Sequence, residues 1–347
     1  MVNFGKKVVK YRVLILILGV LLLIPSVFGY LNTRVNYDVL TYLPDNIETM
    51  KGQDILVNDF GTGAFSMFIV DGMEEKDVAE LKEKIEKVDH VANVIWYDSI
   101  ADISVPMSML PDDIYDVFNS DTGTMMAIFF DEGTSSDGIA QIRKIAGKQC
   151  FLSGMSAVVT DTKNLAEKET PVYVLIAVIL AVIVLGLTME SFFVPLLFML
   201  SIGMAIIYNL GSNYFMGEIS YITKALAAVL QLGVTLDYSI FLMHSYEEQQ
   251  VRYDGDKNRA MAHAISQTFS SVMGSSITTI AGFIALCFMS FTLGLDIGIV
   301  MVKGVIFGVI ACVTILPSMI LCCDKIIEKT KHKPFLPDIG RISDKVT

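Results

Sequence analysis

The sequence predicts a membrane protein that is mostly α-helical, with six transmembrane helices and an α+β domain in water between the first and second of them. Three observations indicate this fold class. The 347-residue chain is 53% hydrophobic and has a mean hydropathy of +0.56. Its apolar residues form six long runs, which ordinary soluble domains lack. Its acidic residues gather in the one long segment between the first two runs.

Each apolar run has a length suited to crossing a bilayer. An α-helix rises about 1.5 Å per residue, so about 20 residues cross a hydrocarbon core of about 30 Å. The runs are Val13–Tyr30, Val172–Thr188, Val194–Phe215, Ile222–His244, Val272–Thr292 and Ile297–Cys322.

The distribution of basic residues predicts the orientation of the chain. Lys and Arg precede the first run, lie between the fourth and fifth runs, and follow the last run. They are Lys6, Lys7, Lys10 and Arg12, then Arg252, Lys257 and Arg259, and then Lys325, Lys329, Lys331 and Lys333. With six spans, all three groups lie on one side, which the positive-inside rule makes the cytoplasm. We therefore expect a multi-pass protein of the cell membrane with both termini cytoplasmic. A signal peptide is the alternative interpretation of the first run.

The charge balance separates an outer domain from the rest of the chain. Residues 31–170 carry 25 acidic and 11 basic residues, a net charge of −14, so the remainder of the chain carries +3 of the total of −11. An acidic domain of this kind argues against a nucleic-acid partner. The predicted layout is a cytoplasmic N-terminus with the first helix (1–30), the extracytoplasmic domain (31–170), a five-helix bundle (171–323) and a cytoplasmic tail (324–347).

The outer domain shows the pattern of a ferredoxin-like, porter-type fold. Its hydrophobic pattern predicts the order β-α-β-β-α-β. The strands are Phe65–Val70, Val91–Tyr97, Thr124–Phe130 and Gln149–Ser153, and the helices are Glu74–Val88 and Ser135–Ala146. A turn-rich stretch with Pro106 and Pro111 separates the second and third strands. The helix after Gly154 is expected to continue into the second span, with Pro171 at the junction.

Asp237 is the residue most indicative of function, because it lies within the fourth apolar run. An acidic group in hydrocarbon costs about 2.5–3.5 kcal/mol on insertion scales, so it needs a functional or structural reason. Gly233 lies on the same helix face as Asp237, and Gln231 and Tyr238 lie on an adjacent face. We expect Asp237 to point into the bundle as a proton relay or ion site. A structural pair with Lys303 is the alternative.

The fifth run offers polar groups that suit such a relay. A small, hydroxyl-rich face opposite Asp237 predicts a polar channel, and tight helix packing alone is the alternative. The residues of this face are Ser275, Ser276, Thr278, Thr279 and Gly282.

Glycines mark the expected helix contacts. Gly304 and Gly308 have the G-x-x-x-G spacing of a packing groove in the sixth run. Gly233 and Gly282 are expected to allow close helix approach in the fourth and fifth runs.

No motif in the sequence indicates a cofactor. There is no G-x-x-x-x-G-K-[ST] sequence, no dinucleotide fingerprint, and no His/Cys cluster with metal-ligand spacing. We therefore expect no catalytic residue, no metal and no cofactor, and hence no enzyme. Energy would come from an ion gradient, and both H⁺ and Na⁺ remain open as the coupling ion at Asp237.

Three motifs resemble the resistance-nodulation-division (RND) superfamily, and most closely its MMPL branch. They are GVTLDYSIFLMHSYEE (233–248), GSSITTIAGFIAL (274–286) and DIGIVMVKGVIFG (296–308). The resemblance implies proton-driven export of lipids, drugs or other amphiphiles. Asp237 and Tyr238 match the Asp–Tyr pair of the family, which implies that they form the proton relay.

The resemblance also implies a partner. Members of this family usually have twelve spans in two similar halves, and this chain has six spans with one Asp–Tyr pair. We expect a second six-helix half, supplied by a second copy or by the continuation of a longer protein.

Two other functions remain open. The five-helix bundle resembles a sterol-sensing module, which would make the chain a lipid-binding sensor or scaffold, and an ancillary proton-driven factor of protein export shares the same layout.

Overall fold

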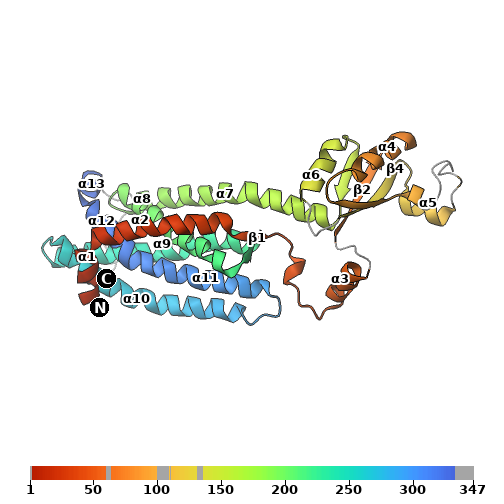
Figure 1. Cartoon of the computed structure of the whole chain (residues 1–347). Helices are drawn as coiled ribbons and strands as arrows, with labels where there is room; N and C mark the ends of the chain where they lie inside the picture. Colours follow the sequence, from red (N-terminus) through yellow and green to blue (C-terminus); the bar gives the residue numbers. More distant parts are fainter. Residues whose placement is uncertain (1, 60–63, 100–108, 110, 131–135, 333–347) are drawn as a thin grey trace, which may run out of the picture. The chain divides into compact units, whose positions relative to one another are not determined.

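The computed structural model describes residues 2–59, 64–99, 109, 111–130 and 136–332, and its contacts divide the chain into two units. A helical unit contains the residues up to Tyr42 and those from Lys168 onward, and an α+β unit contains Leu43–Glu167. Figure 1 shows the elements of both units.

Within the described residues, six helical segments are long and apolar enough to cross a membrane, and each overlaps a predicted run; the fifth, Lys257–Leu286, is shifted toward the N-terminus relative to the predicted Val272–Thr292. They are α2 (Arg12–Asn32), α7 (Met155–Thr188), α8 (Phe193–Ser212), α9 (Tyr221–Arg252), α10 (Lys257–Leu286), and a composite of α11 (Leu293–Ile310), a π-helical turn (Ala311–Ile315) and α12 (Leu316–Cys322). The prediction of six spans is confirmed. Helix α7 also runs through Pro171 without a break, as expected.

Two short helices and a pair of strands complete the helical unit. They are α1 (Val2–Lys10), α13 (Asp324–Lys329), β1 (Arg34–Asn36) and β6 (Glu218–Ser220). Strands β1 and β6 pair in parallel. The carbonyl of Tyr42, at the end of a 3₁₀ turn (Leu40–Tyr42), accepts hydrogen bonds of 3.0 Å from both the backbone N–H and the hydroxyl of Thr292. Residues 31–42, expected in the outer domain, therefore belong with the helices.

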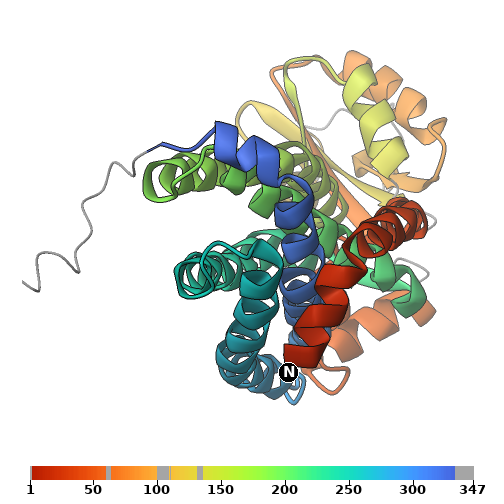
Figure 2. The same ribbon diagram turned by 90° about the vertical axis from the view of Figure 1, so that its left-hand side faces the viewer.

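The spans differ in how much of their surface the chain itself covers. In the apolar windows of α8 and α11–α12, 56% and 61% of residues are buried, against 11% in α2, α7 and α10. Figure 2 looks along the helices and shows α11 and α12 in blue, with α2 in red and α9 in teal on either side. Helices α8 and α11–α12 are thus the core of the bundle, and α2, α7 and α10 form its periphery.

Glycines permit the closest approach in the bundle, where α2 crosses α8. A Cβ atom on Gly211 would lie 2.1 Å from the carbonyl oxygen of Ser26, and one on Gly29 would lie 2.3 Å from the carbonyl oxygen of Gly211. The two backbones touch here, so only glycine fits at both positions.

The α+β unit contains the predicted strands and helices. Its elements are α3 (Glu48–Asn58), β2 (Ala64–Asp71), α4 (Glu75–Glu86), β3 (Val91–Ile95), α5 (Asp112–Phe118), β4 (Gly123–Phe130), α6 (Ser136–Ile145) and β5 (Cys150–Ser153). The sheet has the order β3-β4-β2-β5, with every neighbouring pair antiparallel. Every second residue of β4 is buried, and side chains from the sheet and from α4 and α6 share one core, among them Phe68, Ile85, Ile128 and Ile142.

Two helices of this unit were not predicted from the sequence. Helix α5 follows Pro111 directly, where a turn was expected. Asp112 and Asp113 lie in its first turn, where negative charge is favourable because of the helix dipole. Helix α3 has only a weak apolar face. The expected turn residue Pro106 and Ser135, the first residue of the second predicted helix, lie outside the described residues.

The single tryptophan makes the stability of the α+β unit measurable in the full chain. Trp96 is fully buried in the core of this unit, and its Nε1–H donates to the Thr124 hydroxyl at 2.8 Å. We expect Ile128→Ala to destabilise the unit by about 2–5 kcal/mol, because it leaves a cavity at a fully buried site. Urea titration followed by Trp96 fluorescence measures the change. Met67→Ala is the control, since Met67 is exposed on β2 and should change stability by less than about 1 kcal/mol. Equal losses in both variants would contradict the described core.

Candidate functional site

Asp237 lies on the outer surface of the six-helix unit. Its side chain is exposed, and the described part of the chain supplies no hydrogen bond or ion pair to its carboxylate. The expectation that Asp237 points into the bundle of this chain is therefore wrong. The reason is the rotation of α9. Thr235 faces α11, and Asp237 follows it by two residues, which is a rotation of about 200° around the helix axis, so Asp237 points away from α11.

Tyr238, the next residue, points the other way, into the bundle. It is 3% exposed, and its hydroxyl accepts a hydrogen bond of 3.0 Å from Ser276 on α10. Its backbone carbonyl accepts a contact of 3.3 Å from the thiol of Cys312, which lies in the π-helical turn between α11 and α12. Such turns replace one regular backbone hydrogen bond and often occur at functional sites. The predicted pair thus connects the surface at Asp237 with α10 and α11.

Small and polar residues lie around Asp237, beside exposed large side chains of the same helix such as Leu230 and Phe241, and we call the small and polar set the α9–α10 flank. It consists of exposed residues on two helices that pack side by side: Gly233 and Asp237 on α9, and Ser271, Ser275, Thr278 and Gly282 on α10. A Cβ atom on Gly233 or Gly282 would meet nothing within 4 Å among the described residues. The expectation that these two glycines pack against a helix stays a prediction, and the described residues do not supply that helix.

The other peripheral helices have a different surface. The residues exposed on α2 and α7 are large and aliphatic, for example Leu22, Ile24, Val172 and Leu180. Surfaces of this kind suit lipid chains, whereas glycine and hydroxyl residues are typical of helix–helix contacts in membranes. The α9–α10 flank therefore differs from these surfaces in its glycine and hydroxyl residues, which lie among exposed large side chains such as Phe241 on α9 and Ile277 on α10.

The hydroxyl groups of the flank are partly satisfied within α10. Thr278 and Thr279 donate to the carbonyl of Ser275 at 2.8 and 3.0 Å. Thr279 is half-exposed, and Ser276 is buried against Tyr238. The predicted hydroxyl face is thus divided. Ser276 donates to the Tyr238 hydroxyl inside the bundle, while Ser275 and Thr278 lie at the surface.

Gln231 belongs to a second polar cluster, away from Asp237. Its side-chain oxygen accepts a hydrogen bond of 3.0 Å from Asn209 on α8, and both residues are buried. A Cβ atom on Gly304 would lie 3.1 Å from that oxygen, and one on Gly308 would lie 2.5 Å from the Thr235 hydroxyl. The two glycines of α11 thus form a groove that holds polar side chains of α9. Sequence reasoning missed Asn209, because a single amide in an apolar run carries no periodic signal.

Lys303 does not pair with Asp237. Its ammonium group donates to the Ser212 hydroxyl at 3.2 Å and to the Asn213 side chain, at the end of α8. The alternative of an Asp237–Lys303 structural pair is therefore contradicted.

Another carboxylate, Asp296, accepts hydrogen bonds of 2.8 Å from the backbone of Ser220 and 2.5 Å from the Thr223 hydroxyl, so it anchors the first turn of α9.

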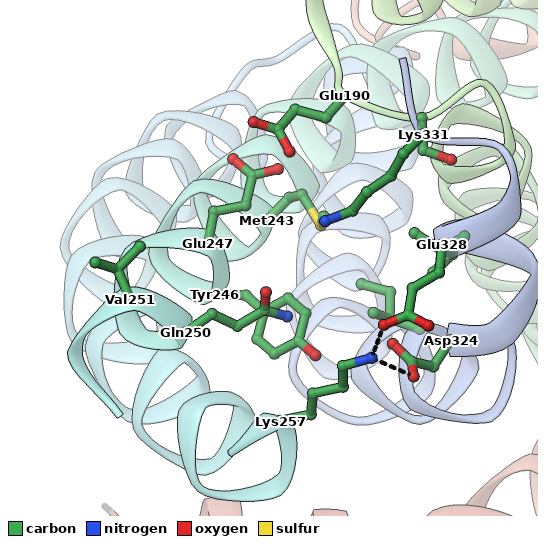
Figure 3. Close-up of a pocket in the computed structure, with 13 residues that line it drawn as sticks. Glu190, Met243, Tyr246, Glu247, Gln250, Val251, Lys257, Asp324, Glu328 and Lys331 are labelled. Carbon is green, nitrogen blue, oxygen red and sulfur yellow. Dashed lines mark hydrogen bonds and ion pairs between the residues drawn. The ribbon is translucent and has the colours of Figure 1, made fainter. Parts of the chain in front are cut away.

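A charged pocket of about 260 Å³ lies at the far end of α9 (Figure 3). Lys257 on α10 donates to Asp324 at 2.6 Å and also to Glu328, so it joins α10 to α13. The hydrogen bond from Lys257 to Glu328 holds the pKa of the Glu328 carboxyl below its usual range. The carboxylates of Glu190 and Glu247 face each other across the other side of the pocket. Glu247 follows Asp237 by ten residues, which is about 15 Å along the helix. Sequence reasoning missed this pocket, since its residues come from four separate segments.

These features define a class: a polytopic membrane protein with six spans, a separate α+β unit and an ionisable residue in mid-span. Residues 131–335, more than half of the chain, match the MMPL family, and the chain belongs to that family.

The chain is also similar to individual proteins. It is 22% identical to the membrane protein ActII-3 of Streptomyces coelicolor over 349 residues, which covers 91% of this chain and 45% of that protein. It is 24% identical over 275 residues to the membrane protein MJ1562 of Methanocaldococcus jannaschii, covering 71% of this chain and 70% of that protein. It is 22% identical over 179 residues to the siderophore exporter MmpL5 of Mycobacterium tuberculosis, covering 50% of this chain and 18% of that protein. The chain thus spans less than half of ActII-3 and 70% of MJ1562.

The contacts of Lys257 generate a prediction about α13. We expect Lys257→Gln to release α13 from α10, because Asp324 and Glu328 then lose their shared cation and repel each other. Hydrogen exchange of the α13 amides should speed up about fivefold at neutral pH, as expected for the loss of a small ion-pair network. Lys325→Gln is the matched control, since none of the ion pairs among the described residues includes Lys325. Unchanged exchange in Lys257→Gln would show that the network does not hold α13.

Proposed function

We propose that this chain is one half of an exporter that the proton-motive force drives and that moves hydrophobic or amphiphilic molecules (lipid, drug or peptide) across the cell membrane. The observation that carries this proposal is the exposure of Asp237 at mid-span, on a flank of small and hydroxyl residues. A carboxylate facing hydrocarbon costs about 2.5–3.5 kcal/mol or more, so this position favours an assembly that covers it. Membership of the MMPL family, which includes a siderophore exporter, supports transport as the activity.

The proposed partner is a second six-helix half, contributed by another copy of this chain, by a partner protein or by the continuation of this one. Its own helices would pack against the α9–α10 flank and enclose Asp237. The open space beside Gly233 and Gly282 supports this arrangement, because small residues let helix backbones approach closely. The 45% coverage of ActII-3 is consistent with a half-size unit.

The proposed coupling cycle starts with protonation of Asp237 from the outer side of the membrane. Enclosure raises the cost of the charged form, so protonation and deprotonation change how stably the two halves pack. Tyr238 passes this change to Ser276 on α10 and to the π-helical turn at Cys312. The proton then leaves toward the end of α9 that carries His244 and Glu247, whose side chains lie 3.6 Å apart. One charge crossing 100 mV supplies about 2.3 kcal/mol.

The α+β unit is proposed to be a ferredoxin-like, porter-type domain outside the cell membrane that handles the substrate. Its β-α-β-β-α-β order and the strand order β3-β4-β2-β5 support this assignment. The basic residues at the ends of α2, α10 and α12 support cytoplasmic termini.

Neutralising Asp237 tests the coupling. We expect Asp237→Asn to reduce proton-coupled transport to the rate of protein-free vesicles, because the amide cannot take up and release a proton. The assay uses pyranine-loaded proteoliposomes under a pH gradient, with ethidium and rhodamine 6G as amphiphilic probes. Asp254→Asn, the same change in the loop after α9, should stay within about twofold of the original rate.

Unimpaired coupling in Asp237→Asn would contradict the proposal. Probe binding that persists without proton movement, in both the original chain and the variant, would instead favour a lipid-binding sensor.

Cross-linking tests the partner surface. In a background without the five native cysteines, we expect Ser275→Cys on the α9–α10 flank to form a disulfide-linked product of twice the chain mass in membranes. Ile183→Cys on the aliphatic surface of α7 is the control and should stay monomeric. A product of another mass would identify a different partner half. Monomer alone at Ser275→Cys, or equal cross-linking of both variants, would contradict the proposed interface.

A further inference from the structure

We propose that a pocket between α1 and the start of α10 binds the head group of an anionic phospholipid. The pocket has a volume of about 520 Å³. Its polar lining consists of Lys6, Lys10 and Arg12 on one side and Asp256, Asn258 and Arg259 on the other. The proposal is independent of the transport function, because it concerns only residues at one end of the bundle.

The charge of this pocket is strongly positive. Four of its side chains are cations and one is a carboxylate, so its net charge is +3. The carboxylate of Asp256 is already used as a helix cap, since it accepts a hydrogen bond of 3.1 Å from the backbone of Arg259. None of the ion pairs among the described residues includes Lys6, Lys10, Arg12 or Arg259. The cations therefore remain available to an external anion.

Two of the cations are held in place by neutral groups. Arg12 donates to the side-chain oxygen of Asn258 at 3.0 Å, which holds its guanidinium against α10. The guanidinium of Arg259 stacks over the ring of Tyr253, 4.6 Å from its centre. Both side chains are thus oriented without being neutralised, which favours binding of a phosphate over a flexible surface contact.

Helix α1 has the properties of a helix that lies at a membrane surface. It runs across the ends of the long helices (Figure 1). Gly5 and Val8 face α10, where a Cβ atom on Gly5 would lie 2.2 Å from the carbonyl oxygen of Ala262. Lys6 and Lys10 are exposed on its other sides. An amphipathic helix with basic residues on its polar face is typical of the interface with anionic lipids.

Apolar surface for acyl chains begins beside the pocket. Helix α2 starts at Arg12, and the following residues Val13, Leu14 and Ile17 are between 52% and 58% exposed. A phosphate in the pocket would thus sit at the membrane surface, with its acyl chains along α2. This continuity distinguishes a lipid from a free anion such as inorganic phosphate, which would gain nothing from α2. Basic pockets between helices at a membrane surface are suited to anionic head groups.

Native mass spectrometry of the full chain in detergent tests the proposal, with phosphatidylglycerol and phosphatidylcholine as probes. We expect phosphatidylglycerol to bind about tenfold more tightly than phosphatidylcholine. The triple variant Lys6→Gln/Lys10→Gln/Arg259→Gln should lose this preference. A triple variant with the same change of net charge, Lys76→Gln/Lys87→Gln/Lys148→Gln, lies in the α+β unit and should keep it. Size-exclusion chromatography shows whether each variant is folded, and Lys10→Gln alone should give a smaller loss of the same kind.

Three results would overturn the proposal. The first is equal binding of the two lipids by the original chain. The second is an unchanged preference in both the pocket triple variant and Lys10→Gln. The third is displacement of phosphatidylglycerol by equimolar inorganic phosphate, which would make the pocket a site for free anions.

Discussion

The cost of exposing an ionisable group at mid-span is the constraint on which this structure depends. Asp237 is placed where hydrocarbon would surround a lone six-helix unit, and the described residues give its carboxylate no partner. A few kcal/mol of unfavourable free energy at one residue is comparable with the net stability of many domains. This cost is the reason why we propose that a second half completes the environment of Asp237 in the membrane.

The direction of Asp237 is set on the opposite side of the same helix. Gly304 and Gly308 bring α11 close to Gln231 and Thr235, which determines the rotation of α9. With that rotation, Tyr238 meets Ser276 and Asp237 is turned outward. The π-helical turn that contains Cys312 touches the carbonyl of Tyr238. A shift of α11 would thus reach both residues of the pair, which gives the proposed relay a mechanical connection to the core of the bundle.

Much of the fold could be predicted from local pattern. The six spans follow from the length of the apolar runs, and the strands and two main helices of the α+β unit follow from alternation and amphipathic spacing. Helix α3 was missed because its apolar face is weak, and α5 was missed because it has only seven residues and directly follows Pro111. The placement of residues 31–42 depends on the parallel pairing of β1 with β6, which joins segments about 180 residues apart. No local pattern contains that information.

The candidate site was predictable in its residues more than in its geometry. Asp237 and Tyr238 are evident as polar residues in an apolar run, but their directions depend on which face of α9 packs against α11. Gln231 was expected near Asp237 and instead pairs with Asn209, since a difference of six residues places it on the side of α9 that faces α8 and α11. The charged pocket around Lys257 joins residues from distant segments, so only the folded chain brings them together.

The most direct test of this account is an experimental structure of the full chain in a lipid nanodisc, with the surroundings of Asp237 as the observation. We predict that a second six-helix unit covers the α9–α10 flank and that its polar groups lie within hydrogen-bonding reach of the Asp237 carboxylate, while α2 and α7 face lipid. A single six-helix unit with Asp237 facing acyl chains, or an assembly joined through α2 or α7, would contradict it.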